Sequence, residues 1–537
     1  MIITKSEKKK LAQIKEQWGK PKNIDRNFNL IAGYLETGDE NYIAADTAGD
    51  LDLNGLFEYI DRTSSKPGQQ YLYKKLHQPG TSAVHFEALE KHIAAVNKDA
   101  GLRELAQLKL SNLSNRNAYN LPSLFSGPQQ HIFSSPIRAY IRIAPWLTAG
   151  LFISLFIVPN QFAFIGMLAM FIANVALHYI NKFKMLGYTH SLPQLLILYN
   201  TAKWLHDNDL IEPNAAIDDS LVKVSKLTDS LSFINVQNQI DVDPTDITYL
   251  ITEWLKMFLA IEPLVFVYSM SRVNMYLSNI KILFEETAKV DMAISVFSVR
   301  EGAGTYCRPQ FSGAGQTLYI KDLYHPLVEN CVTNSISIDN SQGVLITGSN
   351  MSGKTTFIRA VAINTLCAQT INTCFATGYS APILKISTSI NINDDLDASK
   401  SYFQTEALAV KNIIDNVINS KPMNSLVIID EIFRGTNTIE RIAAAKAVLS
   451  YLVENYSFVF VSTHDLELAE LLGTDYKVFS FEERVGDNRL IFDYKIKEGL
   501  LKNKNGIAIL KSLGYPESVI DDANAVGKQL RDRYGLF

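Results

Sequence analysis

Apolar residues in the first 300 positions recur mostly at the three- and four-residue spacing of α-helices. Between residues 51 and 79 this spacing predicts two helices, separated by a break at residues 63–68. More helix is expected over residues 86–113 and through most of residues 188–300. The N-terminal half is therefore predicted to be an all-α core and lever domain.

The chain starts with a basic amphipathic segment, residues 1–22. Leu11, Ile14 and Trp18 fall on one side of the expected helix, and six lysines lie between Met1 and Pro21. No apolar core accompanies these lysines, so the segment is not read as a signal peptide. A solvated surface helix is the plain interpretation, and attraction to anionic lipid or phosphate is the alternative.

A long apolar stretch without Asp, Glu, Lys or Arg runs over residues 143–181. The turn signal Pro159-Asn160 divides it in two, and the second run, residues 162–180, reaches the roughly 17 to 20 residues that a membrane-spanning helix needs. Arginines precede the pair of runs and lysines follow it, which predicts a hairpin with both ends in the cytoplasm. We therefore expect membrane contact through residues 143–180; a buried hairpin inside a soluble bundle is the alternative.

Near Cys307 the pattern changes to short β-branched runs that alternate with helical stretches. Such runs end at Ile338, Thr347, Ile429 and Ser462. Their alternation with helices is typical of a mostly parallel sheet in an α/β domain. The C-terminal half is thus predicted to differ in class from the N-terminal half.

Composition limits the choice of partners and chemistry. A chain of 537 residues is long enough for three or four structural units, and its formal net charge of −4 means that any nucleic-acid contact must come from a local basic face. The cysteines form no C-x-x-C pair, which indicates reduced thiols in a cytosolic domain. They are Cys307, Cys331, Cys367 and Cys374.

The strongest motif follows the run that ends at Thr347. An apolar strand leads into G-x-x-x-x-G-K-T and then into a helix, the context that a phosphate-binding P-loop requires. Glycines let successive backbone N–H groups turn toward phosphate, and Lys354 is expected to reach the β- and γ-phosphates while the Thr355 hydroxyl binds Mg²⁺. The expected cofactors are ATP and Mg²⁺. The nucleotide contacts are expected from Gly348, Ser349, Asn350, Met351, Ser352, Gly353, Lys354, Thr355 and Thr356.

Two later strand ends add acidic and imidazole groups. The strand over residues 425–431 ends in Asp430, expected to hold Mg²⁺ with Thr355, and Glu431, expected to polarise the attacking water. Its distance from the P-loop allows the two strands to be sheet neighbours. His464 follows the next strand, at the sheet edge where ligands bind, and is predicted to sense the γ-phosphate. The alternative for Asp430 and Glu431 is an acidic cap of the following helix, and the alternative for His464 is an ordinary polar loop residue.

Several runs resemble the MutS family of DNA mismatch-repair proteins. DEIFRGTNTIE (residues 430–440) and VSTHDLELAEL (461–471) are similar to its Walker B and histidine-switch regions, and Asn350-Met351 is similar to its P-loop. SYFQTEA (401–407) resembles the signature loop, and residues 504–523 resemble the C-terminal helix-turn-helix. Residues 56–79, 291–311 and 324–330 resemble the start of the core domain and the entry into the ATPase domain.

The resemblance implies a homodimer in which Ser401 of one subunit acts in trans on the ATP of the other, alongside catalytic Glu431 and His464. It also implies DNA as partner (duplex, mismatched or branched) and a role in mismatch repair or related DNA-structure processing. The sequence also departs from the MutS pattern in two respects. Before residue 51 there is no room for mismatch-reading and connector domains of about 100 residues each. No aromatic residue stands near Cys331 to stack on adenine, which leaves Tyr324 and His325 as candidates.

These observations predict an ABC-type α/β P-loop NTPase domain in the C-terminal half, with an all-α core and lever domain and a hydrophobic helical hairpin before it. The ATPase domain is expected in the cytoplasm, anchored in the cytoplasmic membrane. A membrane-anchored mechanochemical ATPase acting on a protein or membrane client without DNA is the alternative function. The predicted divisions are 1–22 basic helix, 23–135 helical core, 136–184 transmembrane hairpin, 185–300 core and lever, 301–500 ATPase domain and 501–537 dimerisation element.

Overall fold

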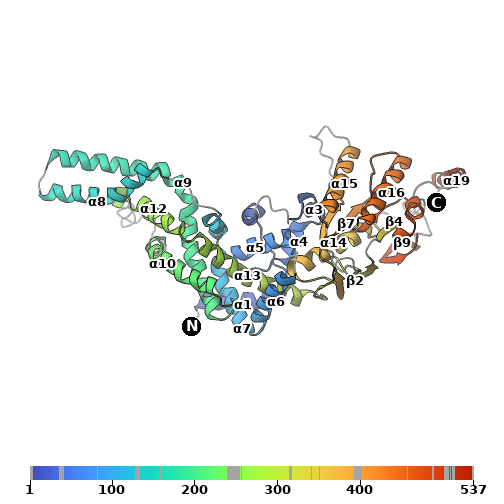
Figure 1. Ribbon diagram of the computed structural model, residues 1–537, viewed down its shortest axis with the longest axis horizontal. Helices are drawn as coiled ribbons and strands as arrows, with labels where there is room; N and C mark the ends of the chain where they lie inside the picture. The colour runs from blue at the N-terminus through green and yellow to red at the C-terminus, as the bar shows by residue number, and fades with distance from the viewer. Residues whose placement is uncertain are drawn as a thin grey trace.

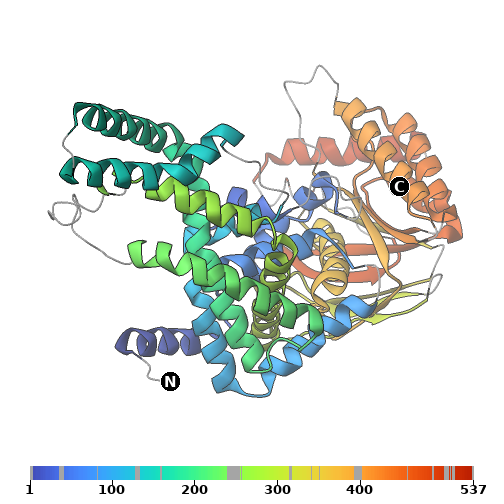
Figure 2. The same ribbon diagram turned by 60° about the vertical axis from the view of Figure 1, so that its left-hand side comes forward.

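The computed structural model describes residues 4–35, 42–80, 83–126, 133–157, 160–238, 254–255, 257–313, 317–339, 342–349, 351–391, 402–421, 423–455, 457–486, 489–500, 507, 510 and 514–534. They form an elongated molecule with a helical hairpin at one end, a helical body in the middle and an α/β domain at the other end (Figure 1). The turned view in Figure 2 again places the hairpin and the α/β domain on opposite sides of the helical body.

The helical body begins with the predicted basic helix. Its Trp18 ring packs edge-on against Phe297 at 5.4 Å, and the guanidinium of Arg103 lies 3.8 Å from the centre of the same ring. The helices and 3-10 turns of this half are α1 (Lys5–Gln17), α2 (Phe28–Ile31), η1 (Ala32–Tyr34), α3 (Ala45–Asp50), α4 (Leu53–Ile60), α5 (Lys66–His77), α6 (Ala83–Asn97), α7 (Ala100–Leu110), η2 (Ser111–Leu113), η3 (Arg116–Leu124), α8 (Ser135–Ile157), α9 (Gln161–Asp207), α10 (Ala215–Asn238), α12 (Ile261–Val273) and α13 (Leu277–Gly302).

Local chemistry explains the predicted break before α5. The hydroxyl of Ser65 accepts a hydrogen bond from the Gly68 N–H at 3.0 Å and caps the helix, and Pro67 occupies the first turn, where a missing N–H costs nothing. Asp291 of α13 accepts hydrogen bonds from the backbone of Ser64 and Ser65. The start of α5 is thereby fixed to α13, a helix of 26 residues in the body.

The hairpin consists of α8 and the first part of α9, and Asn160 caps α9 at the turn. Within the described residues α8 is the one helix that is long and apolar enough to cross a membrane, and the apolar part of α9, Gln161–Leu177, is shorter. α12 packs against the base of the hairpin, where Val267 and Met270 are buried with Ile141.

The α/β domain contains two sheets. The six-stranded sheet has the order β10-β9-β4-β8-β7-β6, parallel throughout except for β10, and the four-stranded sheet has the order β1-β5-β2-β3. The strands are β1 (Gln310–Phe311), β2 (Leu318–Leu323), β3 (Asn334–Ile338), β4 (Gly343–Gly348), β5 (Gly378–Ala381), β6 (Leu384–Ser389), β7 (Asn424–Asp430), β8 (Ser457–Ser462), β9 (Tyr476–Gly486) and β10 (Arg489–Glu498).

Two details differ from the sequence prediction. β3 joins the smaller mixed sheet and not the parallel one, because it pairs antiparallel with β2. The strand with the acidic pair, β7, is not a direct neighbour of the P-loop strand β4, because β8 lies between them. Apolar periodicity identifies a strand but does not specify its partner.

Helices cover both faces of the large sheet. They are α14 (Lys354–Ile371), α15 (Tyr402–Asn419), α16 (Thr438–Glu454), η4 (Gly473–Asp475) and α17 (Glu467–Leu472), with α19 (Glu517–Tyr534) near the C-terminus. Alternate residues of β7 serve the two faces: Leu426 and Ile428 pack in the core with α14, and Val427 and Ile429 pack with α15 and α16. A strand buried on both faces needs the continuous apolar run seen in the sequence.

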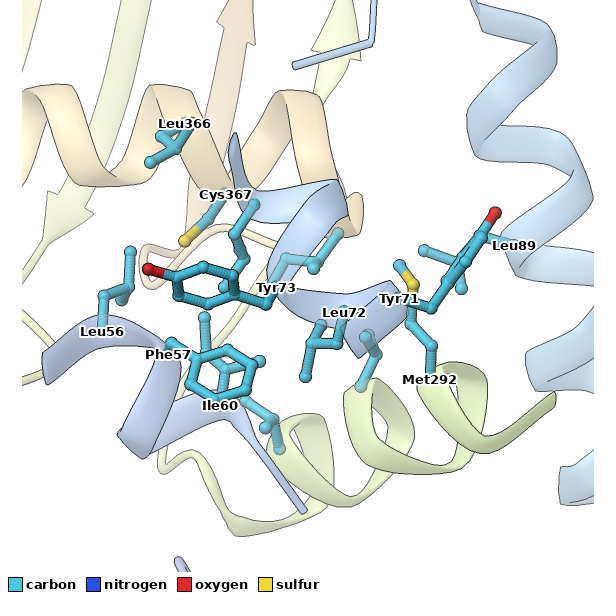
Figure 3. Close-up of a cluster of buried hydrophobic side chains, with 14 of the residues drawn as sticks. Leu56, Phe57, Ile60, Tyr71, Leu72, Tyr73, Leu89, Met292, Leu366 and Cys367 are labelled. Atoms are coloured by element: carbon cyan, nitrogen blue, oxygen red, sulfur yellow. The ribbon is translucent and has the colours of Figure 1, made fainter. Parts of the chain in front are cut away.

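One hydrophobic cluster joins the helical body to the α/β domain. In Figure 3, Tyr73 of α5 lies beside Cys367 of α14, and Leu89 of α6 and Met292 of α13 lie beside Tyr71 of α5; all belong to the same buried cluster. Leu56, Leu72 and Cys367 in this cluster are fully buried. The helix that starts at the P-loop therefore shares its core with the helical body.

A polar cluster, here called the junction cluster, lies beside that core and consists of Glu90, Arg300, Asn372 and Thr373. The buried guanidinium of Arg300, at the end of α13, binds both carboxylate oxygens of Glu90 at 2.5 and 3.1 Å. It also donates to the carbonyl of Asn372 and the hydroxyl of Thr373, each at 2.9 Å, just after α14. The ends of α13 and α14 are thus held together through one side chain.

Candidate nucleotide-binding site

The P-loop runs from the buried strand β4 into α14 through two left-handed glycines. At Gly348 φ is +149°, and a Cβ there would lie 2.8 Å from the Phe481 carbonyl oxygen and 2.9 Å from the Ser352 hydroxyl. At Gly353 φ is +105°, and this residue is the N-cap of α14. Met351 also has a positive φ, of +70°, and its side chain is exposed. The close approach explains why glycine is needed at position 348.

Two polar groups in the loop suit an anionic ligand. The Lys354 ammonium donates to the carbonyl oxygens of Gly348 and Ser349 at 2.8 and 2.9 Å. Burial lowers the pKa of Lys354, and the nearby carboxylates of Glu431 and Asp430 partly offset that effect. The buried hydroxyl of Ser352 has no hydrogen-bond partner among the described residues. A buried hydroxyl and a charged amine at a helix start fit the phosphates of ATP.

The two predicted Mg²⁺ ligands face each other. The Thr355 hydroxyl donates to Oδ2 of Asp430 at 2.7 Å, and the Ser462 hydroxyl donates to Oδ1 of the same carboxylate. Hydroxyl and carboxylate oxygens are the donors that Mg²⁺ prefers. Residues of two strands and one helix therefore converge on one oxygen-rich position.

Glu431 is turned out of the strand direction by its backbone. Its φ is +54°, and its N–H donates to the Ser462 carbonyl at 2.9 Å. One carboxylate oxygen lies 2.9 Å from Nε2 of His464 and the other 2.8 Å from Nε of Arg434. Burial alone would raise the pKa of Glu431, but the hydrogen bond from His464 and the charges of His464, Arg434 and Lys354 outweigh it, so the pKa lies below its ordinary value.

The loop after Glu431 is held by a buried acid of α15. Oε1 and Oε2 of Glu406 accept hydrogen bonds from the backbone N–H groups of Arg434 and Gly435, each at 3.0 Å. A Cβ at Gly435 would lie 2.9 Å from the Phe403 backbone nitrogen, so the loop packs directly on the start of α15. Arg434 and Glu406 were not predicted as site residues, although both lie within the family-like runs.

A cavity of about 590 Å³ opens above these groups. The aromatic residues that line it are Tyr324, Phe357, Phe481 and Tyr494, and His325 lines it as well. Tyr494 comes from β10, has a φ of +51°, and its ring approaches within 3.3 Å of a Cβ placed at Gly353. Burial and the nearby Arg359 lower the pKa of His325 to about 4. Both sequence candidates for the adenine contact thus line the cavity, and Tyr494 is one that the sequence did not suggest.

The structure brings together most of the predicted site. Gly348, Ser349, Lys354, Thr355 and Thr356 line or shape one cavity with Asp430 and Glu431, and His464 lies beside it. Ser349 additionally donates to Oε2 of Glu483 on β9 at 2.7 Å. Asn350 and Ser401 lie outside the described residues, as does most of the segment over 501–513.

A strand–loop–helix of this geometry, with an acidic pair at the end of a parallel strand, defines a P-loop nucleotide-binding domain. Residues 344–531 match the family described as MutS domain V. The chain is 34% identical over 287 residues to the DNA mismatch repair protein MutS of Listeria welshimeri, which covers 51% of this chain and 32% of the relative. It is 34% identical over 235 residues to that of Clostridium perfringens, covering 41% and 25%.

Residues 344–531 therefore match domain V of MutS, a P-loop ATPase domain, and about half of the chain is similar to MutS proteins. The chain spans about a third of the length of the curated relatives that it matches.

Proposed function

We propose that this chain is an ATP-dependent DNA-binding ATPase of the MutS type that works as a homodimer. The observation that carries the proposal is the convergence of Lys354, the Thr355–Asp430 pair and the Glu431–His464 pair on one cavity. Each of these groups has a donor or charge suited to one part of a Mg²⁺-bound nucleoside triphosphate.

The roles follow from the contacts. Lys354, Ser352 and the backbone N–H groups of the P-loop would hold the phosphates, and Thr355 and Asp430 would hold Mg²⁺. When bound, Mg²⁺-ATP supplies the phosphoanhydride bond that is broken. Glu431 orients the attacking water and accepts its proton, since its low pKa keeps it ionised. His464 fixes one oxygen of that carboxylate and is placed to respond to the γ-phosphate.

The dimer completes the site. In this proposal Ser401 of the partner subunit contacts the ATP, and the segment over 501–537 clasps the two ATPase domains. ATP binding then draws these domains together, and the junction between α13 and α14 transmits the movement to the helical levers. The divisions 23–135 and 185–300 act as core and lever, and 301–500 acts as the ATPase domain.

DNA enters the proposal through the relatives, which are named DNA mismatch repair proteins. We propose duplex, mismatched or branched DNA as the partner, gripped by the levers when ATP is bound. With a net charge of −4, DNA contact must come from a local basic face. Binding should then fall steeply with salt, because lysine and arginine side chains that neutralise DNA phosphates release the counterions condensed on them.

The test is DNA binding by the purified chain in detergent across a salt series, with and without ATP. Glu431→Gln should hold the ATP-bound state and retain DNA, and Lys354→Ala should show no response to ATP. A preference among homoduplex, mismatched and branched substrates names the structure recognised. Failure to bind DNA at low salt, with ATP hydrolysis intact, removes DNA from the proposal.

A second candidate function is a membrane-anchored ATPase with a protein or membrane client, and the hairpin favours it. Side chains along α8 and α9 point outward with more than half of their surface exposed, among them Trp146 at 79%, Phe156 at 76% and Phe162 at 73%. The hairpin projects away from the body (Figure 1). Large apolar patches on a soluble protein are normally covered by a partner or by lipid.

The polar groups inside the hairpin also suit a bilayer. The fully buried Asn174 donates to the Phe258 carbonyl at 2.7 Å and accepts from the Tyr140 hydroxyl at 2.7 Å. Polar atoms at membrane depth must be satisfied within the protein, as these are. We propose that residues 143–180 enter the cytoplasmic membrane and leave the ATPase domain in the cytoplasm.

Co-flotation with phospholipid vesicles tests this candidate. The double variant Ile153→Asp/Ile165→Asp puts two charges on exposed positions of the hairpin, each costing about 2.5–3.5 kcal/mol at the bilayer centre. Val222→Asp, on an equally exposed position of α10, is the matched control. The wild type and the control should float and the double variant should not. A wild type that stays in the soluble fraction, or a double variant that floats like it, contradicts the membrane candidate.

A further inference from the structure

Two cysteines face each other where the helical body enters the α/β domain. Cys307 and Cys374 form an isolated antiparallel bridge outside the named strands. The N–H of each donates to the carbonyl oxygen of the other, and both distances are 2.9 Å. Directly opposed residues in such a hydrogen-bonded pair have Cα atoms about 5.5 Å apart, which lies inside the range of about 4.4–6.8 Å found in disulfides.

The two thiols are neighbours and are not equivalent. The adjacent Cys374 side chain lowers the pKa of Cys307. Burial, followed by the adjacent Cys307 side chain, raises the pKa of Cys374 well above its ordinary value. Cys307 is half-buried and Cys374 is fully buried, so an oxidant meets Cys307 first.

The pair sits in the connection between lever and P-loop helix. Cys307 follows α13, and its neighbours Tyr306 and Arg308 touch Arg300 and Glu90 of the junction cluster. Cys374 follows α14 and is adjacent to Thr373, which accepts a hydrogen bond from Arg300. The Cys374 thiol also contacts the Asn364 carbonyl of α14 at 3.7 Å. A covalent bond here would join the exits of α13 and α14, the segments that directly follow these two helices.

We propose that Cys307 and Cys374 are a reversible oxidation site whose disulfide locks the junction between the lever helix α13 and the P-loop helix α14. The oxidant is a small-molecule disulfide of the glutathione type. The Cys307 thiolate attacks the oxidant's S–S bond, which breaks and releases one thiol. The Cys374 sulfur, after losing its proton, then attacks the mixed disulfide at Cys307 and releases the second thiol. Two protein thiols are oxidised and one small disulfide is reduced to two thiols.

Formation of the disulfide does not depend on the proposed ATP-driven movement. Its effect on turnover does rest on that proposed movement. In the reduced protein, the described contacts between the two exits are non-covalent, and these can rearrange during an ATPase cycle. With the disulfide formed, α13 and α14 can no longer move apart at this point. ATP should still bind, because neither cysteine lines the nucleotide cavity, but turnover should slow.

In the experiment, the full-length protein is equilibrated with reduced and oxidised glutathione in varying ratio. The thiols that remain free are then blocked, and the blocked cysteines are mapped by mass spectrometry. ATP affinity and steady-state turnover are measured on the same samples. Cys307→Ser is the matched variant, since serine keeps the size of the half-buried side chain and removes one sulfur. The wild type should lose two hydrogen masses, with one cross-linked peptide joining 307 to 374. Its turnover should fall roughly fivefold or more with ATP affinity kept, and reductant should reverse both changes.

Turnover of Cys307→Ser should not respond to oxidation. The proposal is overturned if the wild type keeps its four free thiols, if Cys307 carries only a glutathione adduct, or if oxidation slows the wild type and Cys307→Ser equally. If the protein hydrolyses no ATP at all, the proposed function fails, and amide hydrogen exchange decides the thiol pair. Slower exchange at residues 303–308 and 372–377 after oxidation then supports the lock, and unchanged exchange overturns it.

Discussion

Replacing Arg300 with methionine should loosen the junction between α13 and α14 more than any other single change in the junction cluster. Methionine keeps the apolar stem and its packing but removes every donor of the guanidinium. The Arg300 side chain is 1% exposed and makes four hydrogen bonds, two of them to Glu90. The change therefore removes a buried ion pair and two neutral hydrogen bonds at once.

The expected loss of local stability can be estimated from the groups that lose Arg300 as their partner. Breaking a buried ion pair by removing one partner costs about 3–5 kcal/mol, and the low end applies because Glu90 is 19% exposed and keeps Arg308 and Asn372 as partners. The Asn372 carbonyl and the Thr373 hydroxyl also lose a donor, at about 1 kcal/mol together, because Thr373 keeps its bond to Ile371. We expect a local loss of about 3–4 kcal/mol.

Native-state hydrogen exchange is the suitable assay, because a chain with several domains need not unfold in two states. A loss of 3 kcal/mol speeds exchange through local opening more than about a hundredfold. The affected amides should be those at the ends of α13 and α14, residues 296–303 and 367–377. Amides of α16, on the far face of the sheet, should exchange as in the wild type.

Arg308→Met is the matched control, because Arg308 binds the same carboxylate from a side chain that is 63% exposed. An exposed ion pair contributes about 1 kcal/mol or less, so this variant should change exchange by roughly fivefold at most. Equal effects of Arg300→Met and Arg308→Met would refute the reasoning. So would faster exchange spread evenly over the whole chain, since that indicates global destabilisation and not a junction.

Three further predictions concern the site and the helical body. In Arg434→Gln the pKa of Glu431 should rise toward its ordinary value, which moves the acid limb of the pH–turnover profile to higher pH; an unmoved limb shows that Arg434 does not tune this carboxylate. Burial raises the pKa of Asp291 to about 6 from 3.8, so the folded state binds its proton more tightly than the unfolded state and stability should fall as the pH rises from about 4 to about 6. Thermal melting of Asp291→Asn should lack that slope, and an equal slope in both proteins contradicts the assignment. Tyr494→Ala should weaken ATP binding roughly tenfold by titration calorimetry while Tyr494→Phe binds like the wild type, and equal binding by all three removes Tyr494 from the base contact.

The sequence was sufficient for those parts of the site that are local in the chain. The P-loop, the acidic pair after β7 and His464 after β8 each belong to a short segment whose residues set its own backbone. Glycine at 348 and 353 is required by the loop itself, and a continuous apolar run is required by a strand buried on both faces. Such features can be predicted from the sequence pattern alone, before the fold is known.

Features that depend on distant segments were not predicted. Tyr494 reaches the P-loop because β10 pairs with β9 next to β4, and Glu483 meets Ser349 because β9 itself pairs with β4. Asp50 of α3 accepts hydrogen bonds from Ile390 and Asn391 at the end of β6, about 340 positions away in the chain. No spacing rule connects residues so far apart. The assignment of β3 to the wrong sheet has another origin, because apolar periodicity does not specify the partner of a strand even when that partner, β2, comes just before it in the chain.

The hairpin illustrates a different limit. The apolar runs and the turn between them follow from the sequence, and helices form over both runs. The length of α9 was not predicted, because this helix continues beyond the apolar run to Asp207. The environment of the two helices does not follow from the sequence, because an apolar surface can be covered by a bilayer or by a protein partner. The vesicle experiment separates these two environments.

The central claim is that Lys354, Thr355, Asp430 and Glu431 form a working ATPase site, and single-turnover kinetics test it most directly. ATP binding and phosphate release are measured for the wild type, Lys354→Ala and Glu431→Gln. The account predicts that Lys354→Ala does not bind ATP, and that Glu431→Gln binds it but hydrolyses it at least about a hundredfold more slowly than the wild type. Hydrolysis by Glu431→Gln at the wild-type rate, or a wild type that binds no ATP, would contradict the account.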